Sequence, residues 1–184
     1  GYSKTISASS NPYLGTQQRK QLLRLMDNPL FKSHSGYVNI RVALAFDHLR
    51  FGEADEAVRL LTEALESEKD HDTEGTHLEE ILVQLALTSL KQGELSNRVN
   101  PSARLVCTLP LGNAQGHQNR SGSTNAVAYL LRLLEMYPDD LRYRWLLNVA
   151  HMTLGTYPAG VPEPFLIPRE FLATDYEIGR FEEI

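Results

Sequence analysis

The sequence predicts an all-α fold: a right-handed stack of antiparallel helix pairs with a long irregular insertion and an irregular C-terminal tail. Small and large apolar residues recur around Gly52 at helical spacing, and part of this pattern returns around Gly93 and Gly155. A glycine after such a run is typical of a helix C-terminus. Prolines crowd into residues 158–168, where the helical pattern stops. The set around the first glycine comprises Leu44, Ala45, Ala57, Leu61 and Ala64.

This spacing is typical of tetratricopeptide (TPR) repeats, in which two short helices pack face to face. The glycines are farther apart than the repeat length of about 34 residues, and a charged linker after residue 66 and an insertion over residues 94–122 account for the excess. Such units bury their apolar faces only by stacking on neighbours. We expect a flexible lead-in over residues 1–15, a TPR-like helical domain over 16–155, and a Pro-rich tail over 156–184.

The composition fits one folded domain without disulfides. The chain has 184 residues, of which 42% are hydrophobic, and a lone cysteine, Cys107, which excludes an internal disulfide. The net charge of -5, with Lys and Arg scattered along the chain, argues against nucleic acid as a partner. No stretch approaches the roughly 20 apolar residues that a membrane-spanning helix needs.

The first helices have clear start and stop signals. An amphipathic helix is expected to begin at Thr16 and to end before Pro29, because the residue before proline disfavours the α region. This helix should cap one open end of the stack. The first helix pair spans residues 38–68 and turns at Gly52.

The second pair is predicted to be split. Thr76 and Glu79 form a capping box at the start of its first helix, which should stop at Gly93. The insertion over residues 94–122 follows, and Ser123 should cap the second helix.

The third repeat is expected to be incomplete. The segment Pro138-Asp139-Asp140 is expected to cap a helix that ends at Gly155, and the tail beyond it should be extended or turn-rich. Several apolar tail residues are available to dock on the last helices: Phe165, Leu166, Ile167, Phe171, Tyr176 and Phe181.

The first helix of each pair should line a concave face made of apolar side chains. An apolar groove of this size exceeds what soluble monomers usually expose, so the insertion, the tail or a partner protein or peptide is expected to cover it. The predicted face comprises Val42, Phe46, Leu49, Val83, Leu87, Leu90, Trp145, Val149 and Met152.

Other candidate chemistry is sparse. Cys107 and His117 both lie in the insertion, where a thiol and an imidazole could form a nucleophile or two metal ligands, although structural roles explain both residues. His48 and His151 occupy equivalent places on two helices and are interpreted as polar packing at the following turn. We expect no catalytic set, cofactor or metal.

Part of the chain resembles a known family. The segments PDDLRYRWLLNVAHMTLGTYPAGVPEPFLIP, VCTLPLGNAQGHQNRSGSTNAV and EIGRFEEI are similar to the TPR-like region that precedes FG-GAP/VCBS repeats in bacterial ASPIC/UnbV proteins, which are relatives of cartilage acidic protein. The resemblance implies a secreted or periplasmic protein with a calcium-binding β-propeller and an ASPIC/UnbV domain beyond Ile184. The matching positions are Cys107, His117, Gly122 and Ser123 in the loop, and Trp145, Asn148, Gly155 and Pro158 at the helix and exit.

Two functions therefore follow from the sequence. The first is a non-catalytic, TPR-like interaction and scaffolding domain, which positions the downstream β-propeller and binds a protein or peptide. The alternative is a metal-binding or enzymatic site that the insertion organises around Cys107 and His117.

Overall fold

The structure is a computed structural model and describes residues 15–31, 36–70, 77–97 and 116–172. Within these ranges the secondary structure is helical and contains no strand, so the expected all-α class is confirmed for this part of the chain. None of the described helices has both the length and the apolar content that crossing a lipid bilayer requires.

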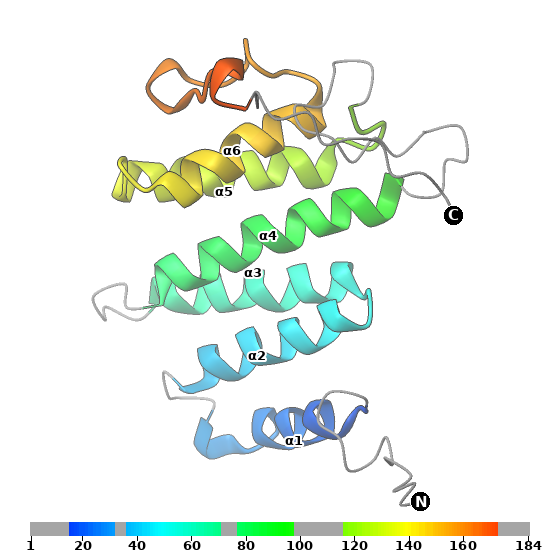
Figure 1. The fold of residues 1–184 in the computed structure, drawn as a ribbon. Coiled ribbons are helices and arrows are strands. Elements are labelled where there is room, and N and C mark those ends of the chain that lie inside the picture. The colour runs from blue at the N-terminus through cyan, green and yellow to red at the C-terminus, as the bar shows by residue number, and fades with distance from the viewer. Residues whose placement is uncertain (1–14, 32–35, 71–76, 98–115, 173–184) are drawn as a thin grey trace, which may run out of the picture.

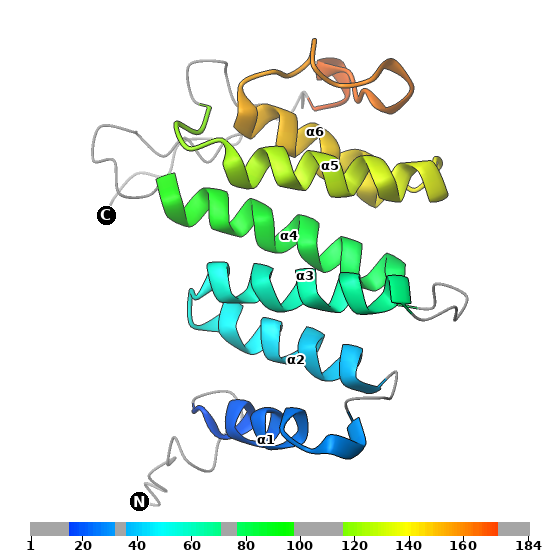
Figure 2. The ribbon, with the colours of Figure 1, turned by 180° about the vertical axis from the view of Figure 1, so that it is seen from behind.

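Successive α-helices run in alternating directions, and each packs against the next, from α1 at one end to α6 at the other (Figure 1). Figure 2 shows the same order from behind. The elements are α1 (Gln17–Met26), η1 (Pro29–Phe31), α2 (Gly36–Arg50), α3 (Ala54–Asp70), α4 (Leu78–Asn97), α5 (Ser121–Met136), α6 (Leu141–Leu154), η3 (Glu163–Phe165) and η4 (Arg169–Phe171).

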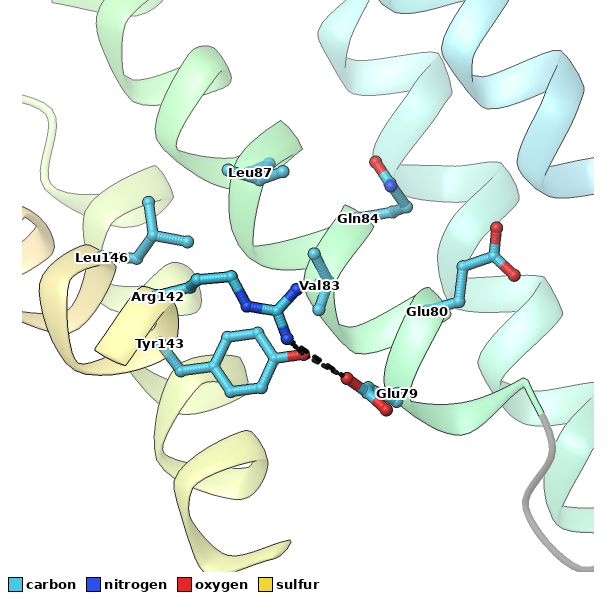
Figure 3. Close-up of a pocket in the computed structure, with 8 residues that line it drawn as sticks. All are labelled: Glu79, Glu80, Val83, Gln84, Leu87, Arg142, Tyr143 and Leu146. Carbon is cyan, nitrogen blue, oxygen red and sulfur yellow. Dashed lines mark hydrogen bonds and ion pairs between the residues drawn. The ribbon is translucent and has the colours of Figure 1, made fainter. Parts of the chain in front are cut away.

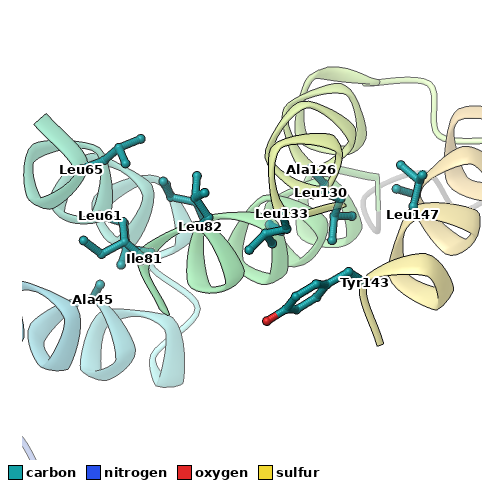
Figure 4. Packing of buried hydrophobic residues seen from close by; sticks show 14 of the residues in the cluster. Ala45, Leu61, Leu65, Ile81, Leu82, Ala126, Leu130, Leu133, Tyr143 and Leu147 are labelled. Carbon is teal, nitrogen blue, oxygen red and sulfur yellow. The ribbon is translucent and has the colours of Figure 1, made fainter. Parts of the chain in front are cut away.

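A continuous apolar interior joins α2 to α6. In α3, small and large side chains alternate at helical spacing, and Ala57, Leu61 and Ala64 are almost fully buried. The central helix α4 is covered on two sides, since α3 and α5 both pack on it (Figure 4). Its buried apolar residues are Ile81, Leu82, Leu85 and Ala86.

The turn after α2 has the expected glycine. Gly52 adopts a left-handed backbone with φ of 77°, which a residue with a side chain rarely takes. Its N–H donates to the carbonyl of Leu49 at 3.0 Å, and the N–H of Glu53 donates to the carbonyl of His48 at 3.0 Å. These two bonds form a Schellman cap that turns the chain into α3.

The end of α6 repeats this cap. Gly155 has φ of 72°, and its N–H donates to the carbonyl of Met152 at 3.0 Å. The N–H of Thr156 donates to the carbonyl of His151, also at 3.0 Å. The predicted correspondence between Gly52 and Gly155 is therefore confirmed at the level of individual hydrogen bonds.

The prediction that a helix stops at Gly93 is wrong, because α4 continues to Asn97. Gly93 is buried inside α4 and faces the first turn of α5. A Cβ atom added to Gly122 of α5 would lie 2.7 Å from the Gly93 nitrogen and 2.4 Å from the Ser89 carbonyl oxygen. Both glycines thus allow two helix backbones to meet, and Gly93 does not terminate a helix.

The boundaries of the insertion shift accordingly. Its first residues belong to α4, and α5 begins at Ser121 rather than at the predicted cap Ser123. Ser123 is fully buried, and its hydroxyl contacts other side chains instead of capping the helix. Thr16 and Asp140 do stand at helix N-termini as predicted, and the Asp140 carboxylate accepts from the N–H of Arg142 at 2.8 Å.

The described part of the tail docks on α6. The Asn148 side chain, which is fully buried, donates to the carbonyl of Phe165 at 2.8 Å and accepts from the N–H of Ile167 at 3.0 Å. Tyr157 donates to the carbonyl of Ile167 at 2.7 Å. Phe165 and Leu166 pack against the apolar interior, as expected, so the tail covers the end of the stack. Phe171 is 80% exposed, so the prediction that it docks is wrong, and Tyr176 and Phe181 lie outside the described residues.

Candidate binding groove between α4 and α6

Two adjoining hollows lie between α4 and α6 and share Leu87. Their volumes are about 410 and 350 Å³. The first is lined by Glu79, Glu80, Val83, Gln84, Leu87, Arg142, Tyr143 and Leu146. The second is lined by Leu87, Leu90, Lys91, Glu94, His117, Val149 and Thr153. We call the two together the α4–α6 groove.

The floor of the α4–α6 groove is apolar. Of the predicted concave face, Val83, Leu87, Leu90 and Val149 line it. These residues come from corresponding faces of two helices that run in the same direction, with α5 lying between them in sequence. Leu87 stands where the hollows meet and leaves 39% of its surface exposed.

The other five predicted face residues divide into two groups. Phe46 and Trp145 are exposed at 47% and 38%, but they line neither hollow, and Leu49 packs partly buried against the interior. Val42 and Met152 are buried at 5% and 1%, so they are core residues and cannot meet a partner. Both belong to the apolar interior that joins α2 to α6.

One end of the α4–α6 groove carries charge (Figure 3). The Tyr143 hydroxyl donates to the Glu79 carboxylate, which also lies 3.9 Å from the Arg142 guanidinium. Arg142 pairs more closely with Asp140, at 2.6 Å, and this bond lowers the pKa of Asp140 to about 2. Glu80 is exposed beside them and makes no hydrogen bond or ion pair with the described residues.

Burial raises the pKa of Tyr143 well above its ordinary value, and the hydrogen bond to Glu79 raises it further. The phenol therefore stays protonated and continues to donate at neutral pH. This bond joins the start of α4 to the start of α6 and fixes the width of the groove at its charged end.

The other end is built around His117. The backbone N–H of His117 donates to the Thr153 carbonyl at 2.7 Å, and the ring Nδ1 of His117 lies 3.1 Å from the Ser123 hydroxyl. The Thr153 hydroxyl lies 2.8 Å from the Ser123 hydroxyl, and Lys91 pairs with Glu94 at 2.7 Å. This network attaches the end of the insertion to α5 and α6.

His117 and Ser123 are adjacent, as in a nucleophile and its base, but their burial opposes that role. Ser123 has no exposed surface, so its hydroxyl cannot reach a substrate in this conformation. Burial lowers the pKa of His117 below its ordinary value of 6.5, and the charge of Glu94 partly offsets this. The imidazole is therefore neutral at pH 7, and its role is the hydrogen bond with Ser123.

A metal site around His117 gains no support from the described residues. Among them, no group of three or more His, Cys, Asp or Glu side chains could hold a metal ion. Cys107, the proposed companion of His117, lies outside the described residues.

Comparisons with known proteins give no assignment. This chain matches no family model, no curated protein and no solved structure.

The charged end of the groove has no clear local signal in the sequence, whereas His117 at the other end is among the predicted candidates. Glu79 was interpreted as a member of a capping box and Asp140 as a helix cap, and Arg142 and Tyr143 were not singled out. A basic and an aromatic residue in the first turn after a capping aspartate are a weak signal for a site. Their meeting with Glu79 depends on the packing of α6 near α4, which no local pattern encodes.

The interpretation of His48 and His151 is confirmed. His48 Nδ1 lies 2.5 Å from a Glu53 carboxylate oxygen, and His151 Nδ1 lies 2.8 Å from the Thr156 hydroxyl. In both cases the partner is the residue after the capping glycine. The two histidines secure helix ends and take no part in the groove.

The described part of the tail does not enter the groove. Residues 156–172 line neither hollow. Of the described residues in the predicted insertion, Glu94 and His117 line the groove, and Glu94 belongs to α4. The apolar floor is therefore open to a partner over the part of the chain that the structure describes.

Proposed function

We propose that this chain is a non-catalytic, TPR-like protein-interaction and scaffolding domain that holds a peptide segment of a partner protein in the α4–α6 groove. The observation that carries this proposal is the partly exposed Leu87, at the centre of an apolar floor with polar groups at both ends. Protein-binding sites commonly have this arrangement of an apolar centre and a polar rim.

The TPR-like, right-handed arrangement of helix pairs is part of the proposal. Two observations support it: consecutive helices alternate in direction, and α2 and α6 end in the same glycine cap with the same histidine contact. Matching ends are expected when helices occupy equivalent places in a repeat.

A wider setting is also proposed. The sequence resemblance supports an exported, secreted or periplasmic protein of the FG-GAP/ASPIC-UnbV type, in which this domain positions a downstream β-propeller. Cell fractionation of the product of the full-length gene tests this, and recovery in the cytoplasm alone would contradict it.

The interaction function is tested by comparing two substitutions at side chains that are equally exposed in the wild type. Leu87→Asp places a charge on the groove floor, and Met136→Asp places one on α5, outside the groove; the wild-type side chains are both 39% exposed. Partners captured by the wild-type chain and identified by mass spectrometry should be lost with Leu87→Asp and kept with Met136→Asp. Retention of every partner by a folded Leu87→Asp chain would exclude the groove.

A further inference from the structure

We propose that the α4–α6 groove selects a peptide segment with a lysine or arginine next to two or three apolar residues, and that the cation binds at the Glu79–Glu80 end. This inference rests on the proposed function and specifies the chemistry of the partner.

The charge at this end is unbalanced. Glu79, Glu80 and Asp140 supply three carboxylates, and Arg142 supplies the cation near them. Asp140 holds that guanidinium at 2.6 Å, much closer than Glu79 at 3.9 Å. The end therefore keeps an excess of negative charge, which favours a cationic partner and repels an acidic one.

Glu80 is the acceptor with the most freedom to bind. It is exposed on the rim of the first hollow and makes no ion pair with the described residues, whereas the Tyr143 hydroxyl already donates to Glu79. The two side chains leave α4 in opposite directions (Figure 3), so a lysine or arginine would pair with Glu80, while Glu79 adds to the negative charge of this end. Arg142 lies over the Tyr143 ring with its guanidinium carbon 5.1 Å from the centroid, on the Glu79 side of the hollow and away from Glu80 (Figure 3).

The opposite end has no comparable excess. Lys91 and Glu94 neutralise each other at 2.7 Å, and burial keeps the pKa of His117 below its ordinary value. The groove is thus acidic at the start of α4 and balanced at the other end, so it distinguishes the two directions of a bound segment.

The apolar floor sets the length. Leu90 follows Glu80 by ten residues on α4, which corresponds to about 15 Å at about 1.5 Å per helical residue. An extended peptide covers that length with about five residues, at about 3.3 Å each. One cation followed by two or three apolar residues, with small residues between them, fits this span.

The test uses two fluorescein-labelled peptides, Gly-Lys-Leu-Ala-Leu-Ser and Gly-Glu-Leu-Ala-Leu-Ser, and the full chain, with binding measured by fluorescence anisotropy. The lysine peptide should bind at least tenfold more tightly than the glutamate peptide. Raising the salt concentration should weaken the lysine peptide, because charges near a surface are screened over about 10 Å at about 0.1 M.

Charge reversal then locates the site. Glu80→Lys should weaken binding of the lysine peptide at least tenfold, while Glu135→Lys, at another exposed glutamate on α5, should alter binding less than twofold. Both variants must melt as the wild type does. Equal binding of the two peptides, or of the lysine peptide to wild type and Glu80→Lys, would overturn the inference, as would a failure of both peptides to bind.

The inference and the proposed function can fail separately. If a partner protein is lost with Leu87→Asp and is unaffected by Glu80→Lys, the groove binds proteins without the charge preference, which overturns this inference and leaves the proposed function standing. If Leu87→Asp changes no interaction, the function itself is overturned.

Discussion

Gly122 of α5 lies directly against Gly93 of α4, so closely that a methyl group on Gly122 would come within 2.9 Å of the Gly93 Cα atom. This contact belongs to the most extensive helix pairing in the stack. It also places Ser123 and His117 beside α4 and so shapes one end of the α4–α6 groove.

Gly122→Ala should therefore destabilise the fold. The new Cβ would meet backbone atoms of α4 as close as 2.4 Å, and the two helices would have to move apart. Overpacking of this kind costs about 1–3 kcal/mol. Urea denaturation measures the change in the free energy of unfolding.

Gly93→Ala is the matched control. Its Cβ would lie 3.2 Å from the imidazole of His117, a side chain that can shift, and alanine favours a helix interior by about 1 kcal/mol over glycine. We expect a change smaller than that for Gly122→Ala. Equal stability of Gly122→Ala and the wild type would contradict the backbone contact.

Arg19→Ala should release α1 from the stack. α1 has no buried residue, and its Arg19 guanidinium donates to the Asp47 carboxylate at 2.7 Å and also pairs with Glu53. The Asp47 side chain is 1% exposed, and leaving a buried charge without its partner costs about 3–5 kcal/mol. Arg50, at 3.6 Å, compensates in part.

Hydrogen exchange distinguishes release from global unfolding. The amides of α1 should lose protection in Arg19→Ala, while those of α4 and α5 keep theirs. Arg24→Ala, at an exposed site on the same helix, should leave α1 protected. Unchanged protection of α1 in Arg19→Ala would show that apolar contacts alone hold this helix.

Stability should decrease in mild acid. Burial lowers the pKa of His151, and its Nε2 is buried without a hydrogen-bond partner. Because the unfolded chain binds the proton more readily than the folded chain, stability is full above the ordinary pKa of 6.5 and is lost as the pH falls through the lower folded pKa.

The lowered pKa of His117 acts in the same direction. The melting temperature should fall as the pH is lowered from about 7.5 to about 5, a range that brackets the histidine reference pKa. His151→Gln should make that fall shallower. A slope as steep as that of the wild type would assign the acid sensitivity to other groups.

Asn148→Ala should detach the described tail from α6. The change removes one donor and one acceptor, leaving the Phe165 carbonyl and the Ile167 N–H without their partner. An unpaired buried polar group costs about 1–3 kcal/mol. The exchange rate of the Ile167 amide, measured by NMR, reports the loss directly.

Tyr157→Phe provides the control for this prediction. It removes the hydroxyl that donates to the Ile167 carbonyl but leaves the bond from the Ile167 N–H to Asn148 intact. The Ile167 amide should exchange rapidly in Asn148→Ala and slowly in Tyr157→Phe. Slow exchange in both variants would mean that packing, not the amide, holds the tail.

Helix order could be predicted because its signals are local. Gly52 and Gly155 follow amphipathic runs and must adopt a left-handed backbone, and Asp140 precedes a helix whose first N–H groups it can cap. Each of these features depends on residues within one turn, so the sequence pattern was sufficient.

Gly93 shows where local reasoning fails. It follows an amphipathic run just as Gly52 does, but its role depends on Gly122, which approaches from another helix after the insertion. A glycine that ends a helix and one that admits a neighbouring backbone look the same in a single sequence. The distinction requires knowing which helices touch.

Only the part of the groove that depends on helical spacing could be predicted from the sequence. The helical period identified four residues that line the groove, because they share a face with the correct spacing: Val83, Leu87, Leu90 and Val149. It could not exclude Val42 and Met152, because the period gives the face of a helix and not which of its residues a neighbouring element buries. The charged rim depends on contacts between α4 and α6 and had no local signal.

The bond pair on Asn148 has a mechanical consequence. The Asn148 amide bonds to both the Phe165 carbonyl and the Ile167 N–H, so this segment cannot rotate about a single hydrogen bond. The two bonds together fix the direction in which the chain leaves α6.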